Sequence, residues 1–134
     1  MIKISDFLGK PYQVGGRGPE AYDCYGLVMA AMKQMGVTLP DYGVNADDTN
    51  AVAVLAAAEK HGDDWEQYPL YTDLSKIPAG LVVAFQLKRP GEITHTGVTV
   101  GQGRFIHCLE KRAVCVEPLA RYQKLIEGIY EFRT

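Results

Sequence analysis

Apolar residues recur at helical spacing near the start of the chain and at strand spacing through its second half. The helical pattern comprises Leu27, Val28, Ala31, Met32 and Met35. It predicts an amphipathic helix over 24–35 that ends before Gly36, a residue type common just past helix ends. Asp23 stands directly before this segment, where an aspartate side chain favours helix initiation by accepting a backbone N–H.

Two further helices are predicted from shorter patterns. Residues 2–9 place apolar side chains on one side of a short helix. Residues 50–60 follow Asp47 and Asp48 and precede His61, so acidic groups lie at the N-terminal end of this helix and basic groups at its C-terminal end. Both arrangements complement the helix dipole. We therefore interpret His61 as a helix-terminal residue without a role in chemistry.

From Leu81 onward the spacing of apolar residues changes, and strands are predicted. The unbroken apolar run 81–85 is typical of a buried strand, and alternation of apolar and polar residues predicts the others. These further strands span 94–100, 104–109, 113–116 and 129–132, and 65–71 adds a short extended segment. Helices followed by strands indicate an α+β fold in which N-terminal helices pack on a mostly antiparallel sheet of about five strands.

The composition is that of an ordinary globular domain. The chain has 134 residues, 47% hydrophobic and 22% charged, which predicts a single domain over 1–134. Its net charge of −2, with lysine and arginine scattered, argues against a nucleic-acid partner. No apolar run approaches the roughly 20 residues of a membrane span. Residues 1–7 lack the apolar core of a secretory signal, so we expect synthesis in the cytoplasm without a signal peptide.

Cysteine usage gives no disulfide framework, because the chain has three cysteines. Cys108 and Cys115 flank a turn-like segment and could face each other across a hairpin. Two reduced thiols are the more common case in a chain of the cytosol. We therefore expect these two cysteines to be reduced side chains of the core.

Cys24 is the candidate nucleophile. It occupies the first turn of the predicted helix and follows an irregular glycine-rich run from Gly15 to Gly18. Free N–H groups and the positive end of the helix dipole favour a thiolate at this position, which predicts a lowered pKa for Cys24. The alternative interpretation is a small buried hydrophobic residue without reactivity.

Whether His95 and His107 lie together depends on the turn between their strands. A two-residue turn would place the two imidazoles on opposite faces of the sheet. A three-residue loop that ends with Gly103 in the left-handed conformation would set Val100 opposite Arg104 and put both imidazoles on one face, about 7–8 Å apart by backbone position. The glycine favours the three-residue loop.

On one face, these side chains form a coherent set for acyl chemistry. Cys24 would attack an acyl carbon, His95 would act as general base and then as acid to the leaving amine, and His107 would fix the tautomer of His95. Gly97, between the two histidines and opposite His107, would leave room for the helix that carries the cysteine. Backbone N–H groups at the helix start would stabilise an oxyanion.

Five segments in order resemble the NlpC-type cysteine peptidases, papain-like enzymes of bacterial cell-wall cleavage. They are Pro11-Tyr12, Gly15-Gly16, Asp23 to Val28, His95 to Val98 and Gly103 to His107, and they span nearly the whole chain. The resemblance implies the papain-like NlpC-type fold, with Cys24 as nucleophile, His95 as base and His107 as orienting residue. No cofactor and no metal are expected.

The resemblance also implies a substrate class. Such enzymes hydrolyse amide bonds in peptidoglycan stem peptides, typically between D-glutamate and a diamino acid. Tyr12 would place its hydroxyl beside the cysteine, although a half-buried loop tyrosine is an equal alternative. Asp23 would cap the helix, hold the free amino end of the substrate, or do both. Tyr25 stands where the family usually has serine, so its bulk is expected to alter substrate binding.

The run Gly15-Gly16-Arg17-Gly18-Pro19 before the cysteine resembles versions of the family in tailed bacteriophages and prophages. This implies association with phage tail proteins or the virion tail. One alternative is a non-catalytic tail assembly module on the same fold, which an intact Cys24, His95 and His107 argue against. Another is a metal site formed by these three residues with Cys108, which lacks the close paired spacing of structural zinc ligands.

Overall fold

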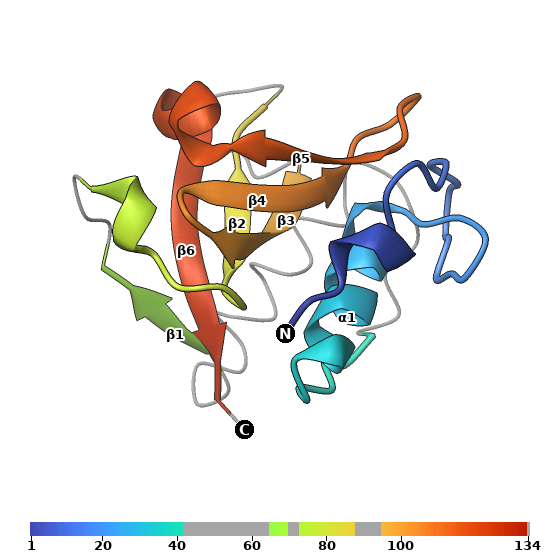
Figure 1. The fold of residues 1–134 in the computed structure, drawn as a ribbon, viewed down its shortest axis with the longest axis horizontal. Coiled ribbons are helices and arrows are strands. Elements are labelled where there is room, and N and C mark those ends of the chain that lie inside the picture. Colours follow the sequence, from blue (N-terminus) through green and yellow to red (C-terminus); the bar gives the residue numbers. More distant parts are fainter. Residues whose placement is uncertain (42–64, 70–72, 88–94, 134) are drawn as a thin grey trace.

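The computed structural model describes residues 1–41, 65–69, 73–87 and 95–133. A short 3-10 helix, η1 (Ile4–Asp6), and the α-helix α1 (Cys24–Gln34) precede the strands (Figure 1). The strands are β1 (Trp65–Tyr68), β2 (Val82–Phe85), β3 (His95–Gly101), β4 (Arg104–Cys108), β5 (Val114–Pro118) and β6 (Ile126–Phe132). Two more 3-10 helices are η2 (Leu74–Lys76) and η3 (Leu119–Leu125).

The six strands of the described residues belong to one antiparallel sheet with the order β1-β6-β2-β3-β4-β5. This confirms the predicted α+β class, with one strand more than expected because β1 pairs with β6. The predicted helix over 2–9 is wrong in extent. Only Ile4–Asp6 of this range are helical, and Phe7 is the C-cap. Further on, Gly9 has a φ of +82° and its N–H donates to the Val114 carbonyl at 3.1 Å, so the chain there is tied to β5. The predicted helix over 50–60, with the neighbouring His61, lies outside the described residues.

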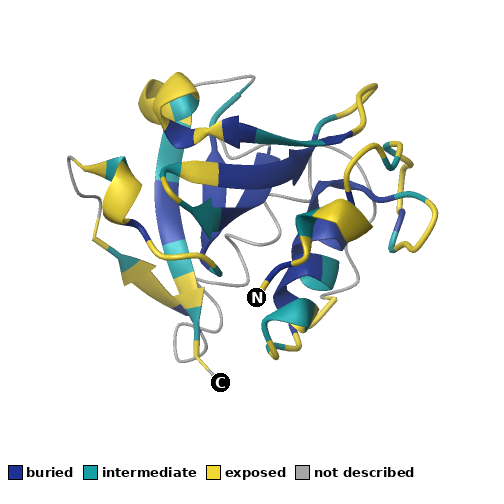
Figure 2. Cartoon of the chain, in the orientation of Figure 1, coloured by how far each residue is buried: buried dark blue, intermediate teal, exposed yellow. Residues whose placement is uncertain are grey.

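Apolar side chains are buried on both faces of the sheet, and α1 covers one of them. Figure 2 shows buried residues concentrated along β2, β3 and β4. The cluster beneath α1 includes Tyr25, Leu27, Val28, Val82, Val98 and Ile106. The cluster on the other face includes Ile77, Val83, Phe85, Phe105, Leu119 and Ile129, with Leu74 of η2 and Tyr122 of η3 packed against it.

α1 begins at the predicted residue, Cys24, and ends at Gln34, one residue before the predicted end. Asp23 is the N-cap, and its Oδ1 accepts the backbone N–H of Gly26. At the other end Gly36 has a φ of +82°, and the Val37 N–H closes back on the Met32 carbonyl at 3.0 Å. A left-handed glycine in this position is a common way for a helix to end.

The connection between β3 and β4 differs from the predicted three-residue loop. Gly101 lies opposite Arg104, and the two-residue turn consists of Gln102 and Gly103, with φ of 56° and 73°. Positive φ at both central positions is typical of a type I′ hairpin turn. The register shifts at Val100, an extra residue on β3. This bulge provides the one-residue shift that the longer loop was expected to provide.

The shifted register pairs Gly97 with His107 and puts both imidazoles on one face, as predicted. The role predicted for Gly97 is wrong. A Cβ atom there would meet the Phe105 ring at 3.0 Å and the His107 Cβ at 3.2 Å. Gly97 therefore makes room for side chains of the histidine face, whereas α1 packs on the opposite face.

The glycine-rich run contacts the start of α1 backbone to backbone. A Cβ atom at Gly26 would overlap the Gly16 carbonyl oxygen, which accepts the Asp23 N–H at 3.0 Å. A Cβ atom at Gly16 would lie 2.8 Å from the Cα of Tyr22. Glycine at both positions thus allows the loop to approach the helix start closely, and this approach positions Cys24.

Cys108 and Cys115 do not face each other, because Cys108 pairs with Val114 and Cys115 pairs with His107. Their side chains therefore project from opposite faces of the sheet. All three cysteines are free thiols. Within the described part of the chain, no helix combines the length and the apolar character that crossing a membrane requires.

Candidate active site

Cys24 is the first residue of α1, and only 5% of its surface is exposed. Burial, and after it the Asp23 carboxylate, raise the pKa of the Cys24 thiol to about 11. Thr96, through its side chain and backbone, and the Tyr25 backbone act in the opposite direction. The predicted lowering of this pKa is therefore wrong for the free protein. The free energy lost when a thiolate is removed from water exceeds the stabilisation that the donors near the helix start provide. The thiol is protonated at neutral pH.

Thr96 is the point at which the thiol meets the sheet. It directly follows His95 on β3, and its buried side chain lies on the α1 face. Its hydroxyl oxygen has no well-aligned hydrogen bond within the described residues, yet it stands close enough to the Cys24 sulfur to favour the thiolate. The thiol therefore meets β3 beside His95 but on the α1 face, whereas the two imidazoles project from the other face, where they pack against Phe85 and Phe105. The prediction that all three side chains share one face is thus wrong for Cys24, because α1 covers the face opposite the histidines.

His95 and His107 are joined directly. The distance between His95 Nε2 and His107 Nδ1 is 2.8 Å, a hydrogen-bond distance. Both rings are buried, and they pack against Phe85 and Phe105. This burial lowers the pKa of both imidazoles. The charge of His107 lowers the pKa of His95 further, while a hydrogen bond to Glu117 partly offsets the effect of burial on His107. Both imidazoles are therefore neutral at pH 7.

Glu117 belongs to this site and was missed by the sequence analysis. Its Oε2 lies 2.6 Å from His107 Nε2 and accepts the Tyr122 hydroxyl at 2.7 Å, while its Oε1 accepts an Arg121 N–H at 2.7 Å. Burial acts to raise the pKa of Glu117, but these donors outweigh it and the pKa is lowered. A signal was present, because Cys115 is the cross-strand partner of His107 and Glu117 follows two residues later on the same face.

Tyr12 is electrostatically coupled to the thiol of Cys24. Burial raises its pKa, and the next contribution is the negative charge that Cys24 would carry as a thiolate. The backbone of Tyr12 is held by a bridge to Tyr22 and by donation of its N–H to the Arg112 carbonyl at 3.2 Å. Both the placement of the Tyr12 hydroxyl beside the cysteine and its contact with a substrate stay predictions.

Asp23 and Tyr25, the other predicted substrate-binding residues, are both fully buried. Besides capping α1, Asp23 accepts an N–H of Arg17 on Oδ2 at 2.7 Å. Tyr25 packs beneath α1 and donates its hydroxyl to the Pro40 carbonyl at 2.6 Å. Their burial gives no support to direct contact with a substrate, so these binding roles stay predictions.

Comparison with known proteins agrees with this arrangement. A family model described as the NlpC/P60 family matches residues 9–126. The chain belongs to the NlpC/P60 family. The matched range contains Tyr12, Cys24, His95, His107 and Glu117.

Curated relatives of this NlpC/P60 chain are named as peptidases or hydrolases. A probable endopeptidase of Mycobacterium tuberculosis is 32% identical over 100 residues, covering 75% of this chain and 20% of the relative. The murein DD-endopeptidase MepH of Escherichia coli is 31% identical over 108 residues, with coverages of 79% and 34%. The gamma-DL-glutamyl hydrolase of Bacillus subtilis is 29% identical over 130 residues, with coverages of 94% and 27%. The chain thus spans only a minor part of each relative.

Solved NlpC/P60 structures share the fold. A NlpC protein of Trichomonas vaginalis matches with a TM-score of 0.64 and 24% identity, covering 94% of this chain and 40% of that one. The NlpC/p60 domain of the peptidoglycan hydrolase SagA matches with a TM-score of 0.61 and 18% identity, and the match covers 96% of this chain and 92% of that domain. These matches confirm the predicted α+β, papain-like NlpC-type fold.

Among the described residues of this NlpC/P60 domain, one donor set is compact enough to be considered for a metal. The donor atoms of His107, Cys115 and Glu117 all lie within 4.8 Å of one another. Glu117, however, is already paired with Arg121, whose charge would repel a cation. Burial, and then the Glu117 charge, raise the pKa of Cys115, which opposes the thiolate that a metal requires. These residues are better explained as part of a hydrogen-bond network.

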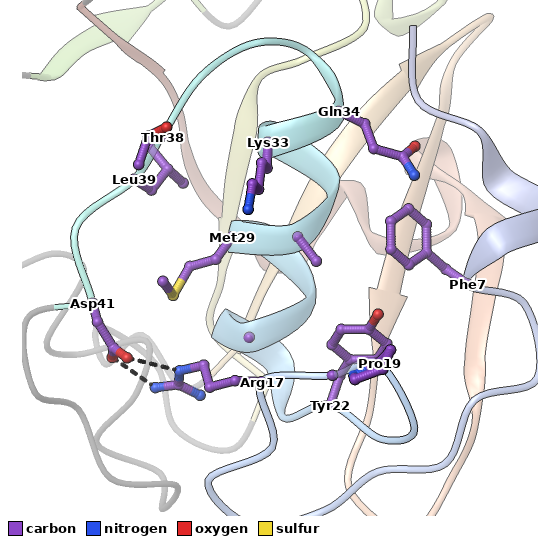
Figure 3. A pocket seen from close by; sticks show the side chains of 13 residues that line it. Phe7, Arg17, Pro19, Tyr22, Met29, Lys33, Gln34, Thr38, Leu39 and Asp41 are labelled. Atoms are coloured by element: carbon purple, nitrogen blue, oxygen red, sulfur yellow. Dashed lines mark hydrogen bonds and ion pairs between the residues drawn. The ribbon is translucent and has the colours of Figure 1, made fainter.

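A cavity of about 770 Å³ lies along the side of α1 marked by Met29 and Lys33 (Figure 3). At its edge Arg17 binds Asp41 through two hydrogen bonds of 3.2 and 3.0 Å. Cys24, His95 and His107 do not line this cavity. It is therefore separate from the thiol and the imidazole pair.

Proposed function

We propose that this chain is a cysteine peptidase that hydrolyses amide bonds in peptidoglycan stem peptides. The observation that carries the proposal is the buried 2.8 Å contact between His95 and His107. His95 lies on β3 directly before Thr96, the residue that interacts with the Cys24 thiol. The names of the relatives, an endopeptidase, a murein DD-endopeptidase and a gamma-DL-glutamyl hydrolase, support the reaction class.

We propose Nδ1 as the reacting nitrogen of His95, and the contact of Nε2 with His107 supports this choice. Because Nε2 is bonded to His107, Nδ1 is the atom that accepts the proton of the Cys24 thiol. The sulfur then attacks the carbonyl carbon, and N–H groups at the start of α1 stabilise the oxyanion. His95 passes the proton from Nδ1 to the leaving amine, which leaves a thioester on the cysteine. In the second half of the reaction, His95 activates the water that hydrolyses this thioester.

Within the stem peptide, we propose the bond between D-glutamate and the diamino acid. The order of motifs supports this choice, as does the name of the Bacillus subtilis relative, whereas the Escherichia coli relative is named for a different bond. Among the predicted binding residues, only Tyr12 keeps part of its side chain exposed. Tyr12 is therefore the residue that we place against the substrate, near the reacting carbonyl.

The pH dependence of activity should show that the Cys24 thiol and the two histidines are neutral in the resting protein. We expect kcat/KM to stay constant from neutral pH to below about pH 6.5, the usual pKa of histidine, and to fall only at lower pH. Burial lowers the pKa of both His95 and His107, so they remain able to accept a proton where a free histidine is charged. The thiol of Cys24, with a pKa of about 11, imposes no alkaline limit near neutral pH.

Two measurements check this expectation. A profile of kcat/KM against pH that falls on the alkaline side near neutral pH would contradict it, because an imidazolium would then be the resting form. The free energy of unfolding should also decrease as the pH drops below about 6.5, since the unfolded histidines bind protons that the folded ones do not. This contribution to the free energy of unfolding is fully present above the pKa of the unfolded histidines. It is lost as the pH falls toward the lower pKa values of the folded histidines.

Mass spectrometry of muropeptide digests tests the proposed reaction directly, because it reports both the activity and the bond. Purified peptidoglycan and a synthetic stem tetrapeptide should each yield fragments that end at D-glutamate. Fragments from another bond would correct the proposed specificity while keeping the reaction class. Intact substrates after prolonged incubation with folded protein would overturn the proposal.

On the sequence motif alone, we also propose association with a phage tail. The glycine-rich run before Cys24 is the feature behind this proposal. Peptide mass spectrometry of purified virions should then detect the chain in tail fractions. Recovery with tail proteins, together with no cleavage of stem peptides, would favour the alternative of a non-catalytic assembly module. Cleavage without recovery in virions would remove the tail association only.

A further inference from the structure

We propose that Glu117 is a positioning residue that acts through His107 to keep His95 in the one tautomer that can accept the thiol proton. The inference rests on the proposed function, and it adds a fourth side chain to the site. A continuous set of contacts supports it: Glu117 Oε2 to His107 Nε2 at 2.6 Å, then His107 Nδ1 to His95 Nε2 at 2.8 Å. Each contact uses a different nitrogen, so the three side chains form one chain.

The order of protons along this chain follows from the carboxylate. An ionised Glu117 only accepts hydrogen bonds, so His107 Nε2 carries the proton between them. A neutral His107 then has a bare Nδ1, which must accept the Nε2 proton of His95. A neutral His95 with its proton on Nε2 has a bare Nδ1. This is the nitrogen that takes the proton of the Cys24 thiol in the proposed mechanism.

The opposite order would disable the base. If the group at position 117 donated a hydrogen to His107, the His107 proton would move to Nδ1 and be donated to His95 Nε2. His95 would then carry its own proton on Nδ1 and could not accept another. Two neutral imidazoles in contact allow both orders, so an external group must select one. Within the described residues, the group that contacts the far nitrogen of the pair is the Glu117 carboxylate.

The carboxylate itself is held in place from both oxygens. Oε1 is paired with Arg121 at 2.7 Å, and Oε2 accepts the Tyr122 hydroxyl at 2.7 Å as well as the His107 N–H. Arg121 and Tyr122 belong to η3, which follows β5 directly. Only 8% of the Glu117 surface is exposed. An acid with this many donors remains an acceptor, which is the property that the relay requires.

Glu117→Gln is the decisive variant, because it keeps the shape of the side chain and allows its amide to donate or to accept. We expect kcat to fall about 10- to 100-fold with KM little changed, the range typical of outer groups that orient a catalytic side chain. Glu117→Asp keeps the negative charge but places the carboxylate farther from His107, and it should retain more activity than Glu117→Gln. The matched control is Glu127→Gln. Glu127 lies on β6 and accepts the hydroxyl of Tyr130 at 2.7 Å, and its substitution should leave kcat unchanged.

A spectroscopic readout separates positioning from a loss of folding. In 15N spectra of the histidine rings, His95 and His107 of the wild type should both show protonated Nε2 and bare Nδ1. In Glu117→Gln, protonated Nδ1 should become populated in both rings. The acid limb of kcat/KM should also move to lower pH in this variant, because His107 loses the negative charge that favours its protonated form. Neither change is expected from Glu127→Gln.

Failure of this inference and failure of the proposed function give different results. If the wild type cleaves stem peptides while Glu117→Gln keeps both wild-type kcat and wild-type ring spectra, the role of Glu117 is overturned and the peptidase proposal stands. If the wild type cleaves no stem peptide but Glu117→Gln changes the tautomers as expected, the relay is supported and the proposed reaction is overturned.

Discussion

Replacing Cys24 by alanine should reduce hydrolysis of stem peptides by about a thousandfold or more, to the background of the assay. The reason is that, in the proposed mechanism, the Cys24 thiol forms the covalent bond to the acyl carbon. The measurement is the initial rate of muropeptide release at a fixed protein concentration. Thermal unfolding should remain cooperative, because alanine is well tolerated in the first turn of a helix.

Cys108→Ala is the matched control for this variant. Cys108 is also a buried thiol, its Sγ lies 3.5 Å from the Tyr22 carbonyl oxygen, and burial raises its pKa to about 12. Its loss should lower stability and leave the rate per folded molecule unchanged. Hydrolysis that survives in Cys24→Ala, or that disappears only in Cys108→Ala, would remove Cys24 from the role of nucleophile.

The second large effect concerns the backbone contact that positions the helix start. Gly26→Ala should destabilise the fold by about 3 kcal/mol or more, since its Cβ would overlap the carbonyl oxygen of Gly16 and approach Asp23 Oδ1 to 3.0 Å. Neither neighbour can move freely, because one belongs to the backbone and the other caps α1. At roughly 4 °C per kcal/mol for a domain of this size, Tm should fall by about 12 °C.

Gly36→Ala provides the comparison, because a Cβ there would meet nothing within 4 Å but the residue has a φ of +82°. It should cost only about 1–2 kcal/mol, the strain of a left-handed alanine. Denaturant titrations of both variants measure the difference. Equal losses would mean that the loop of Gly16 shifts away from α1 at little cost, and that its contact with the helix does not position Cys24.

The local patterns that could be predicted involve residues close together in the sequence. The helix with its cap at Asp23 and its stop at Gly36 follows from hydrophobic spacing and from the chemistry of single residues. The shared face of His95 and His107 was also predicted, although for a partly wrong reason. A bulge at Val100, which a sequence pattern does not reveal, supplied the register shift that was assigned to the loop.

The features that were missed depend on residues distant in the sequence. Glu117 was left out because the predicted strand 113–116 ended one residue before it, while the structure extends β5 to Pro118. Its importance comes from its contact with His107 on the neighbouring strand β4, which depends on the register between β4 and β5. The pKa of Cys24 was predicted with the wrong sign for a similar reason. Helix position is visible in a sequence, but the burial that outweighs it is not.

The sequence by itself determined the class of fold, the helix that begins at Cys24, and the candidate pair of histidines, because short-range spacing decides which side chains share a helix face or a strand face. Only the tertiary structure decided which nitrogens meet, which acid completes the network, and that the thiol and both imidazoles are neutral at rest. These properties depend on distances of a few ångströms between different strands and on the exclusion of water, which arise when the sheet and helix pack together.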